Sequence, residues 1–165
     1  MKGLNSSFHT KTALLVLALL LVLGVTHSPA QKKEQAMEEA GIAFTKGKWQ
    51  DVLAEAKKNG KYIFVDAYTS WCGPCKLLKS KTFKEEKAAA YFNAHFVNYT
   101  LDMEKGEGIS LAEQWAVMAY PTLLFFNPNG KLVMRQVGFV NGDKLVDFGQ
   151  QAKSINNVNN RASLQ

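Results

Sequence analysis

Residues 65–76 read Val65-Asp66-Ala67-Tyr68-Thr69-Ser70-Trp71-Cys72-Gly73-Pro74-Cys75-Lys76, and they place both cysteines of the chain directly after a mostly apolar segment. That segment, Tyr62 to Tyr68, is a nearly continuous apolar run with β-branched and aromatic members, which predicts a strand covered on both faces of a sheet. A helix is expected to begin near Cys72. Two cysteines three residues apart can close a disulfide if they lie on the first turn of a helix, where positions i and i+3 share one side.

The two cysteines are expected to differ in their chemistry. As the first residue of the helix, Cys72 would meet unpaired backbone N–H groups and the positive end of the helix dipole, which favour a thiolate. Pro74 fits a first helical turn because its missing N–H has no partner there. Cys75 would lie deeper, where burial favours the neutral thiol. An accessible sulfur that attacks and a hidden one that resolves are what thiol–disulfide exchange through a mixed disulfide requires.

Three other interpretations of the cysteine pair fit less well. A zinc site needs two further ligands, and after residue 30 the sequence offers a single histidine, His95, besides carboxylates. Haem attachment needs a histidine directly after the second cysteine, where Lys76 stands. A permanent structural disulfide is the remaining alternative, although so small a loop removes little entropy from the unfolded chain.

Asp66 is the one carboxylate inside the apolar run. Burial disfavours the charged form of a carboxyl group, so the pKa of Asp66 is expected to be raised and the group could exchange protons near neutral pH. The alternative is a solvated aspartate at the end of a strand.

Hydrophobic periodicity and turn residues predict further elements that alternate strands and helices around a mixed sheet, which is the α/β class. The expected strands are 41–44, 62–68, 96–101, 122–126 and 131–137, with a turn at Asn127-Pro128-Asn129-Gly130 between the last two. The expected helices are 48–59, a helix from about 72 through 78, 85–94, 110–116 capped by Ser110, and 141–152.

Composition excludes several classes of protein. Among 165 residues, 47% are hydrophobic and 11% aromatic, which is enough for one compact domain and too much for wholesale disorder. The formal charge of +6 becomes +4 without residues 1–30, which carry Lys2 and Lys11. Arg135 and Arg161 are the only arginines and no dense basic cluster occurs, so no nucleic-acid partner is expected.

The N-terminus has the pattern of a secretory signal peptide. Two lysines precede the unbroken apolar run 13–25, and Ser28-Pro29-Ala30 offers small residues to a signal peptidase, with Gln31 as the new N-terminus. As a helix the run spans about 20 Å, short of a roughly 30 Å hydrocarbon core, and an uncleaved membrane anchor is the alternative. The expected organisation is a signal peptide (1–30), a charged lead-in (31–40), a domain (41–153) and a flexible tail (154–165).

Two motifs resemble the thioredoxin family. Trp71 to Lys76 (WCGPCK) matches the family's active-site motif, and Ala119 to Phe125 (AYPTLLF) is similar to its cis-proline loop and following strand, while Val137-Gly138 fits a late strand-end glycine. The resemblance covers roughly residues 44–152 and implies a thioredoxin-like fold with a central mixed sheet flanked by helices. It is greatest to exported thioredoxin-like proteins of bacteria, whose reduced form is maintained by a membrane electron conduit.

The resemblance implies a chemical role for three residues. Cys72 would be the nucleophile and Cys75 the resolving thiol. Asp66, six residues before Cys72, would match the buried carboxylate that moves a proton on and off the second cysteine. The pair would cycle between dithiol and disulfide, with no metal and no other cofactor.

The resemblance also implies a substrate-binding surface. Pro121 would be cis and lie against the disulfide, and the backbone at Tyr120 would pair with an extended substrate segment as an added strand. Trp71 would cover the cysteines, and Gly73 and Pro74 would complete the surface.

The chain departs from the family pattern at several positions. The family often pairs its buried carboxylate with a lysine on the neighbouring strand, and the corresponding place here is near the uncharged Asn98. Tyr68 stands where a tryptophan is common, and Tyr120 is bulkier and more polar than the usual aliphatic residue. The segment 103–108 (MEKGEG) lengthens the loop after a strand and is expected to be solvated surface, with a binding loop as the alternative.

Together these features predict an exported thiol–disulfide oxidoreductase. The Gly73-Pro74 pair resembles the reducing members of the family, so reduction of protein disulfides in the bacterial periplasm is expected. The expected partners are disulfide-containing proteins and a membrane electron-donor protein, and the domain is expected to be a monomer. The alternative is a non-catalytic binding module that holds a partner in the groove beside Pro121 while its cysteines stay idle.

Overall fold

The computed structural model describes residues 41–162. The predicted signal peptide (1–30), the lead-in (31–40) and the last three residues of the predicted tail lie outside the described residues. Among the described residues, no helix is both long and apolar enough to span a membrane.

Four strands form one mixed sheet in the order β2-β1-β3-β4. Its strands are β1 (Tyr62–Tyr68), β2 (Phe96–Asp102), β3 (Thr122–Phe126) and β4 (Leu132–Val137). β1 pairs with β2 in parallel and with β3 in antiparallel orientation, and β3 and β4 form an antiparallel hairpin. β1 lies inside the sheet with five consecutive buried residues, which confirms the prediction from its apolar run.

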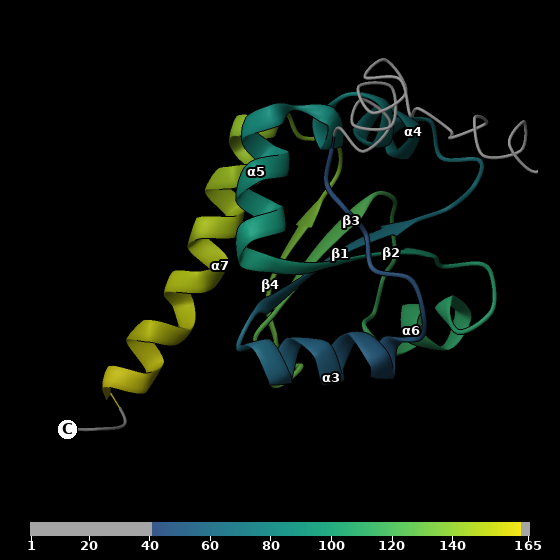
Figure 1. Cartoon of the computed structure of the whole chain (residues 1–165). Helices are drawn as coiled ribbons and strands as arrows, with labels where there is room; N and C mark the ends of the chain where they lie inside the picture. Colours follow the sequence, from purple (N-terminus) through teal and green to yellow (C-terminus); the bar gives the residue numbers. More distant parts are fainter. Residues whose placement is uncertain (1–40, 163–165) are drawn as a thin grey trace, which may run out of the picture. The chain divides into compact units, whose positions relative to one another are not determined.

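Within residues 41–162, five helices flank the sheet, and Figure 1 shows their arrangement. They are α3 (Trp49–Asn59), α4 (Gly73–Ser80), α5 (Glu86–His95), α6 (Gly108–Gln114) and α7 (Gly142–Ala162), with a short 3-10 turn at Thr82–Lys84. α5 and α7 pack together on one face, and α3 and α6 lie on the other. α3 ends where Gly60 adopts a left-handed conformation (φ 63°), which a residue without a side chain adopts at no steric cost.

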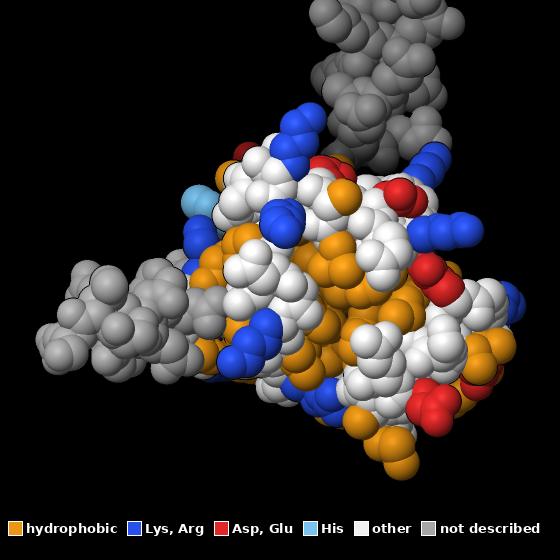
Figure 2. All heavy atoms as spheres, turned by 90° about the horizontal axis from the view of Figure 1, so that it is seen from below, with side chains coloured by type: hydrophobic (Ala, Val, Ile, Leu, Met, Phe, Trp, Pro, Cys, Tyr) orange, Lys and Arg blue, Asp and Glu red, His pale blue; other side chains and the backbone are white. Residues whose placement is uncertain are grey.

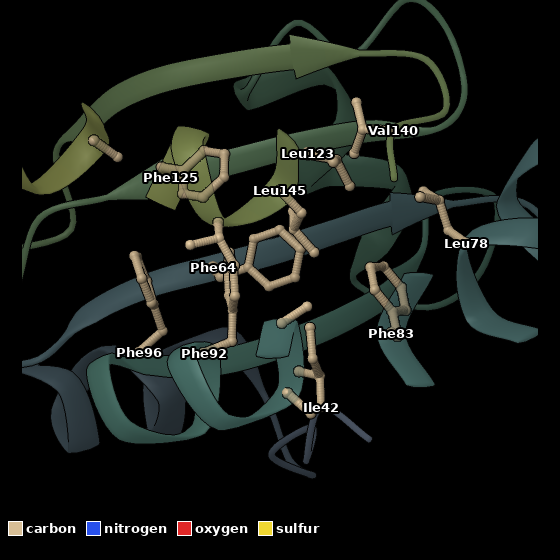
Figure 3. Packing of buried hydrophobic residues seen from close by; sticks show 14 residues of the cluster. Ile42, Phe64, Leu78, Phe83, Phe92, Phe96, Leu123, Phe125, Val140 and Leu145 are labelled. Atoms are coloured by element: carbon tan, nitrogen blue, oxygen red, sulfur yellow. The ribbon is translucent and has the colours of Figure 1, made fainter. Parts of the chain in front are cut away.

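Each face of the sheet has its own hydrophobic cluster. On the α5–α7 side, Phe64 of β1 packs against Phe92 of α5 and Phe125 of β3, with ring centroids 4.7 and 5.4 Å apart (Figure 3). On the α3 side, Trp49 packs edge-on against Trp115, with ring centroids 4.9 Å apart. Figure 2 views the molecule from this second side and shows hydrophobic side chains reaching the surface among lysines and acidic residues.

Three predictions about the elements were wrong. Residues 41–44 form no strand, and the next residue, Thr45, makes an isolated bridge to Tyr99. The helix predicted at 110–116 begins two residues earlier, and Ser110 is no cap because its hydroxyl donates to the Glu107 carbonyl. α7 continues as a helix to Ala162, past the end predicted at 152.

Candidate active site

The two cysteines lie at the start of α4 and are joined as a disulfide, with their Cα atoms 5.3 Å apart. Cys72 is the N-cap of α4 rather than its first helical residue, one position earlier than predicted. Its sulfur accepts a hydrogen bond from the backbone N–H of Cys75 over 3.1 Å. Pro74 lies in the first turn, as expected. The cap position exposes the sulfur of Cys72 to the free N–H groups of the helix, so the environment favours a thiolate there.

Burial of the cysteines differs from the prediction. Cys72 was expected to be accessible and Cys75 hidden, yet both are buried, with 3% and 4% of their surfaces exposed. Once joined, the two sulfurs lie together and share one environment. The exposed groups beside them are Trp71, Gly73 and Pro74.

Residues of the second motif lie beside the first. The Tyr120–Pro121 peptide bond is cis, as the resemblance implied. The Tyr120 ring contacts the Trp71 ring edge-on, with centroids 6.0 Å apart. The backbone N–H of Gly138, which follows β4, donates a hydrogen bond to the Pro121 carbonyl over 2.8 Å. This bond connects the end of β4 to the loop that contains Pro121.

Asp66 of β1 is buried, and the alternative of a solvated aspartate was wrong. Its Oδ2 accepts a hydrogen bond of 3.0 Å from the hydroxyl of Thr100 on β2. Desolvation raises the pKa of Asp66 from 3.8 to about 6, and the Thr100 hydrogen bond and the positive charge of Lys79 partly oppose this rise. A carboxyl group with this pKa can take up and release a proton near neutral pH.

The resemblance assigned the place of the family's usual lysine to near Asn98, two residues before the strand partner of Asp66. The parallel register pairs Asp66 with Thr100, whereas Asn98 pairs with Phe64. The Asn98 amide instead donates to the Ala43 carbonyl and to Asn93, so it holds the segment before α3. The pairing of Asp66 with Thr100 follows from the register of the two strands, in which Tyr62 lies opposite Phe96.

Lys79 of α4 is a second residue that the sequence reasoning missed. Its ammonium group lies 4.3 Å from the centroid of the Tyr68 ring, a cation–π contact. Tyr68 is two residues after Asp66 on β1, so both side chains point to the same face of the sheet. Lys79 thereby supplies positive charge on the side of the buried carboxyl group.

The segment 103–108 is more than the solvated surface that was predicted. Met103 is buried, and its backbone N–H donates to the Tyr68 carbonyl over 2.8 Å. Both carboxylate oxygens of Glu104 accept hydrogen bonds from the indole N–H of Trp71, over 2.9 and 3.1 Å. This loop therefore reaches the cysteine site. Nothing in the sequence signalled that contact, because it depends on the path of the loop.

The described residues contain no group of three or more His, Cys, Asp or Glu side chains that could hold a metal ion. The site consists instead of a cysteine pair at a helix N-terminus, a buried carboxyl group and an aromatic rim. Such a set can exchange one disulfide for another and manage the accompanying proton.

Comparisons with known proteins agree with this geometry. The family model of the thioredoxin-like domain matches residues 49–153. The chain is 28% identical over 137 residues to the thiol:disulfide interchange protein DsbD of Pseudoalteromonas atlantica, a match that covers 81% of this chain and 23% of that protein. It is 30% identical over 146 residues to thioredoxin H2-1 of Oryza sativa, covering 86% of this chain and 96% of that protein.

Solved structures show the same likeness. The solution structure of a proposed disulphide-isomerase from Bacteroides thetaiotaomicron shares 45% sequence identity at a TM-score of 0.62, covering 68% of this chain and 93% of that one. A thioredoxin from Thermus thermophilus shares the fold at 19% identity and a TM-score of 0.58, covering 70% of this chain and 87% of that one. The match to the DsbD relative spans less than a quarter of that protein's length.

Proposed function

Because the chain belongs to the family of thioredoxin-like domains, we propose that it is an exported reductase of protein disulfides that works through Cys72 and Cys75. Membership of the family makes it a thiol–disulfide oxidoreductase with a redox-active cysteine pair and no cofactor. The direction of electron flow, the compartment and the roles of single residues belong to the proposal. The observation that carries it is the cysteine pair at the start of α4 together with a buried carboxyl group of raised pKa.

The reaction begins with Cys72 as a thiolate. Its sulfur attacks one sulfur of a substrate disulfide, which forms a mixed disulfide and releases the other substrate sulfur as a thiolate. Cys75 then loses its proton, which Asp66 accepts, and attacks the Cys72 sulfur. The mixed disulfide breaks, the second substrate sulfur leaves as a thiolate, and Cys72 and Cys75 are joined. Two electrons have passed to the substrate, and a thiol donor must reduce the pair before the next cycle.

The direction of the proposal rests on the Gly73-Pro74 pair, which resembles reducing members of the family. A second candidate, disulfide isomerisation, is favoured by the description of the Bacteroides thetaiotaomicron structure. The names of the other relatives, a thiol:disulfide interchange protein and a thioredoxin, agree with disulfide exchange in general. Recovery of activity from ribonuclease with scrambled disulfides distinguishes the two candidate functions, because an isomerase restores that activity without net reduction of disulfides.

Insulin reduction tests the proposal. Residues 31–165 with dithiothreitol should accelerate the precipitation of insulin chains, and Cys72→Ser should abolish the acceleration. Cys75→Ala should trap substrates as mixed disulfides on Cys72, because the resolving thiol is missing. Lys76→Ala, which leaves both sulfurs in place, is the matched control. Wild-type kinetics equal to those of dithiothreitol alone would exclude the enzyme and favour the binding module with idle cysteines.

Export is the second part of the proposal. The apolar run 13–25, the small residues at 28–30 and two lysines before the run support a cleaved signal peptide. In a bacterial host the full chain should appear in the periplasm with Gln31 as its first residue. A chain that keeps residues 1–30 and sediments with membranes would favour an uncleaved anchor. We further propose that a membrane protein supplies the electrons and that the exported domain is a monomer, which light scattering can measure.

A further inference from the structure

Trp71 is exposed yet held in one place. With 64% of its surface exposed, its indole contacts water on most sides, so packing alone does not fix its orientation. Two contacts fix it instead. Its N–H donates to both carboxylate oxygens of Glu104, over 2.9 and 3.1 Å, and its ring meets the Tyr120 ring edge-on at 84°. A hydrogen bond to a charged acceptor is stronger than one between neutral groups.

The loop that carries Glu104 is fixed on both sides of this residue. Before it, the backbone N–H of Met103 donates to the Tyr68 carbonyl over 2.8 Å, and the Met103 side chain is buried. After it, one carboxylate oxygen of Glu107 accepts hydrogen bonds from the Trp49 backbone and from the Tyr99 hydroxyl. Glu104 is therefore presented from a rigid support although its own side chain is exposed.

We propose that Glu104 is a positioning residue that holds the Trp71 indole against Tyr120, so that a partner segment meets a preformed aromatic rim beside Cys72. This inference rests on the proposed function. An exposed aromatic side chain that is ordered before binding loses less conformational entropy when a partner docks. Because Glu104 acts through Trp71 and takes no part in the exchange itself, it should affect docking of a protein substrate and leave the chemical step unchanged.

Steady-state kinetics test the inference on the exported domain, residues 31–165. In Glu104→Ala the KM for a protein disulfide should rise about threefold to tenfold, the range expected for loss of one hydrogen bond, while kcat stays constant. Glu104→Gln keeps an oxygen that can accept the indole hydrogen bond and should restore most of the loss. Glu113→Ala removes an exposed carboxylate of α6 and is the matched control. Oxidised glutathione, too small to use the rim, should react equally with all variants.

A second measurement needs no turnover. Proton exchange of the Trp71 indole N–H, followed by NMR on 15N-labelled protein, should be faster in Glu104→Ala and close to wild type in Glu104→Gln and Glu113→Ala. An unchanged exchange rate in Glu104→Ala, or an unchanged KM, overturns the inference. Failure of the proposed function would give a different result, because the wild-type protein itself would then not reduce insulin. The indole exchange rate would still report the hydrogen bond between Trp71 and Glu104.

Discussion

The hydroxyl of Thr100 donates a hydrogen bond to the carboxylate of Asp66 across the parallel β1–β2 pair, with 3.0 Å between Oγ1 and Oδ2. This donor is neutral, and the other carboxylate oxygen, Oδ1, has no hydrogen-bond partner within residues 41–162. Burial therefore outweighs the stabilisation of the charged form and raises the pKa of Asp66 to about 6. This buried carboxyl group of β1 therefore has a pKa close to neutral pH.

Asp66→Asn should stabilise the protein at high pH and not at low pH. The folded-state pKa of about 6 lies above the ordinary 3.8, so ionisation of Asp66 is disfavoured by folding. Well below pH 3.8 the group is protonated in both the folded and the unfolded state, and its burial then carries no ionisation cost. As the pH rises through 6 the cost grows to about 3 kcal/mol, at about 1.4 kcal/mol for each unit of pKa difference.

Urea unfolding of the oxidised protein measures this effect. The stability of Asp66→Asn relative to wild type should be about 2 kcal/mol greater at pH 8 than at pH 4. The comparison between the two pH values removes any difference in packing between Asp and Asn, which does not depend on pH. An equal difference at both pH values would show that Asp66 is not a buried carboxyl group with a raised pKa.

Thr100→Val should move the pH dependence of disulfide reduction upward. The Thr100 hydrogen bond lowers the pKa of Asp66, so its loss raises that pKa further above 6. In the proposed mechanism the Asp66 carboxylate accepts the proton of Cys75. That carboxylate then forms only at higher pH, so the acidic limb of the kcat/KM profile should shift in the same direction. Thr100→Ser keeps the hydroxyl and should retain the wild-type profile. A profile that is the same in Thr100→Val and wild type would remove Asp66 from the resolving step.

Lys79→Met should shift the same profile upward by a smaller amount. Lys79 lowers the pKa of Asp66 through its charge, and this effect is weaker than that of the Thr100 hydrogen bond. Lys76→Met is the matched control, because Lys76 is an exposed lysine on the same helix that has no part in the pKa of Asp66. Raising the salt concentration should reduce the difference between Lys79→Met and wild type, since an exposed charge is screened. Equal shifts in both variants would assign the effect to the net charge of α4 rather than to Lys79.

Four of the five expected strands and the cysteine motif could be predicted because their signals are local. The apolar run of β1 and the WCGPC sequence carry their own structural preferences, and every residue of both was placed correctly to within one position. The partner of Asp66 could not be found in this way. It depends on the register of β1 and β2, whose paired residues Asp66 and Thr100 lie far apart in the sequence, and the local sequence of neither strand specifies that register.

The role of segment 103–108 was missed for a related reason. Its composition, with glycines and charged residues, is that of a solvated loop, and Glu104 is indeed exposed. What the loop contacts is decided by the arrangement of β1, α3 and α6 around it, which the local sequence does not encode. The start of α6 shows the same limit, because the helix begins at Gly108 and not at the cap predicted at Ser110.

Glu107→Ala should destabilise the domain through the start of α3. The Glu107 Oε1 atom accepts the backbone N–H of Trp49, the first residue of α3, over 2.9 Å and the Tyr99 hydroxyl over 2.6 Å. A negatively charged carboxylate at this place also interacts favourably with the positive end of the dipole of α3. Removing it leaves two partly buried donors without this acceptor, which should cost about 2 kcal/mol of unfolding free energy in urea. Glu107→Gln keeps an acceptor oxygen and should cost less, and Glu113→Ala should cost nearly nothing. If Glu107→Ala were as stable as Glu113→Ala, the loop would not be anchored to α3, and the rigid support inferred for Glu104 would be lost with it.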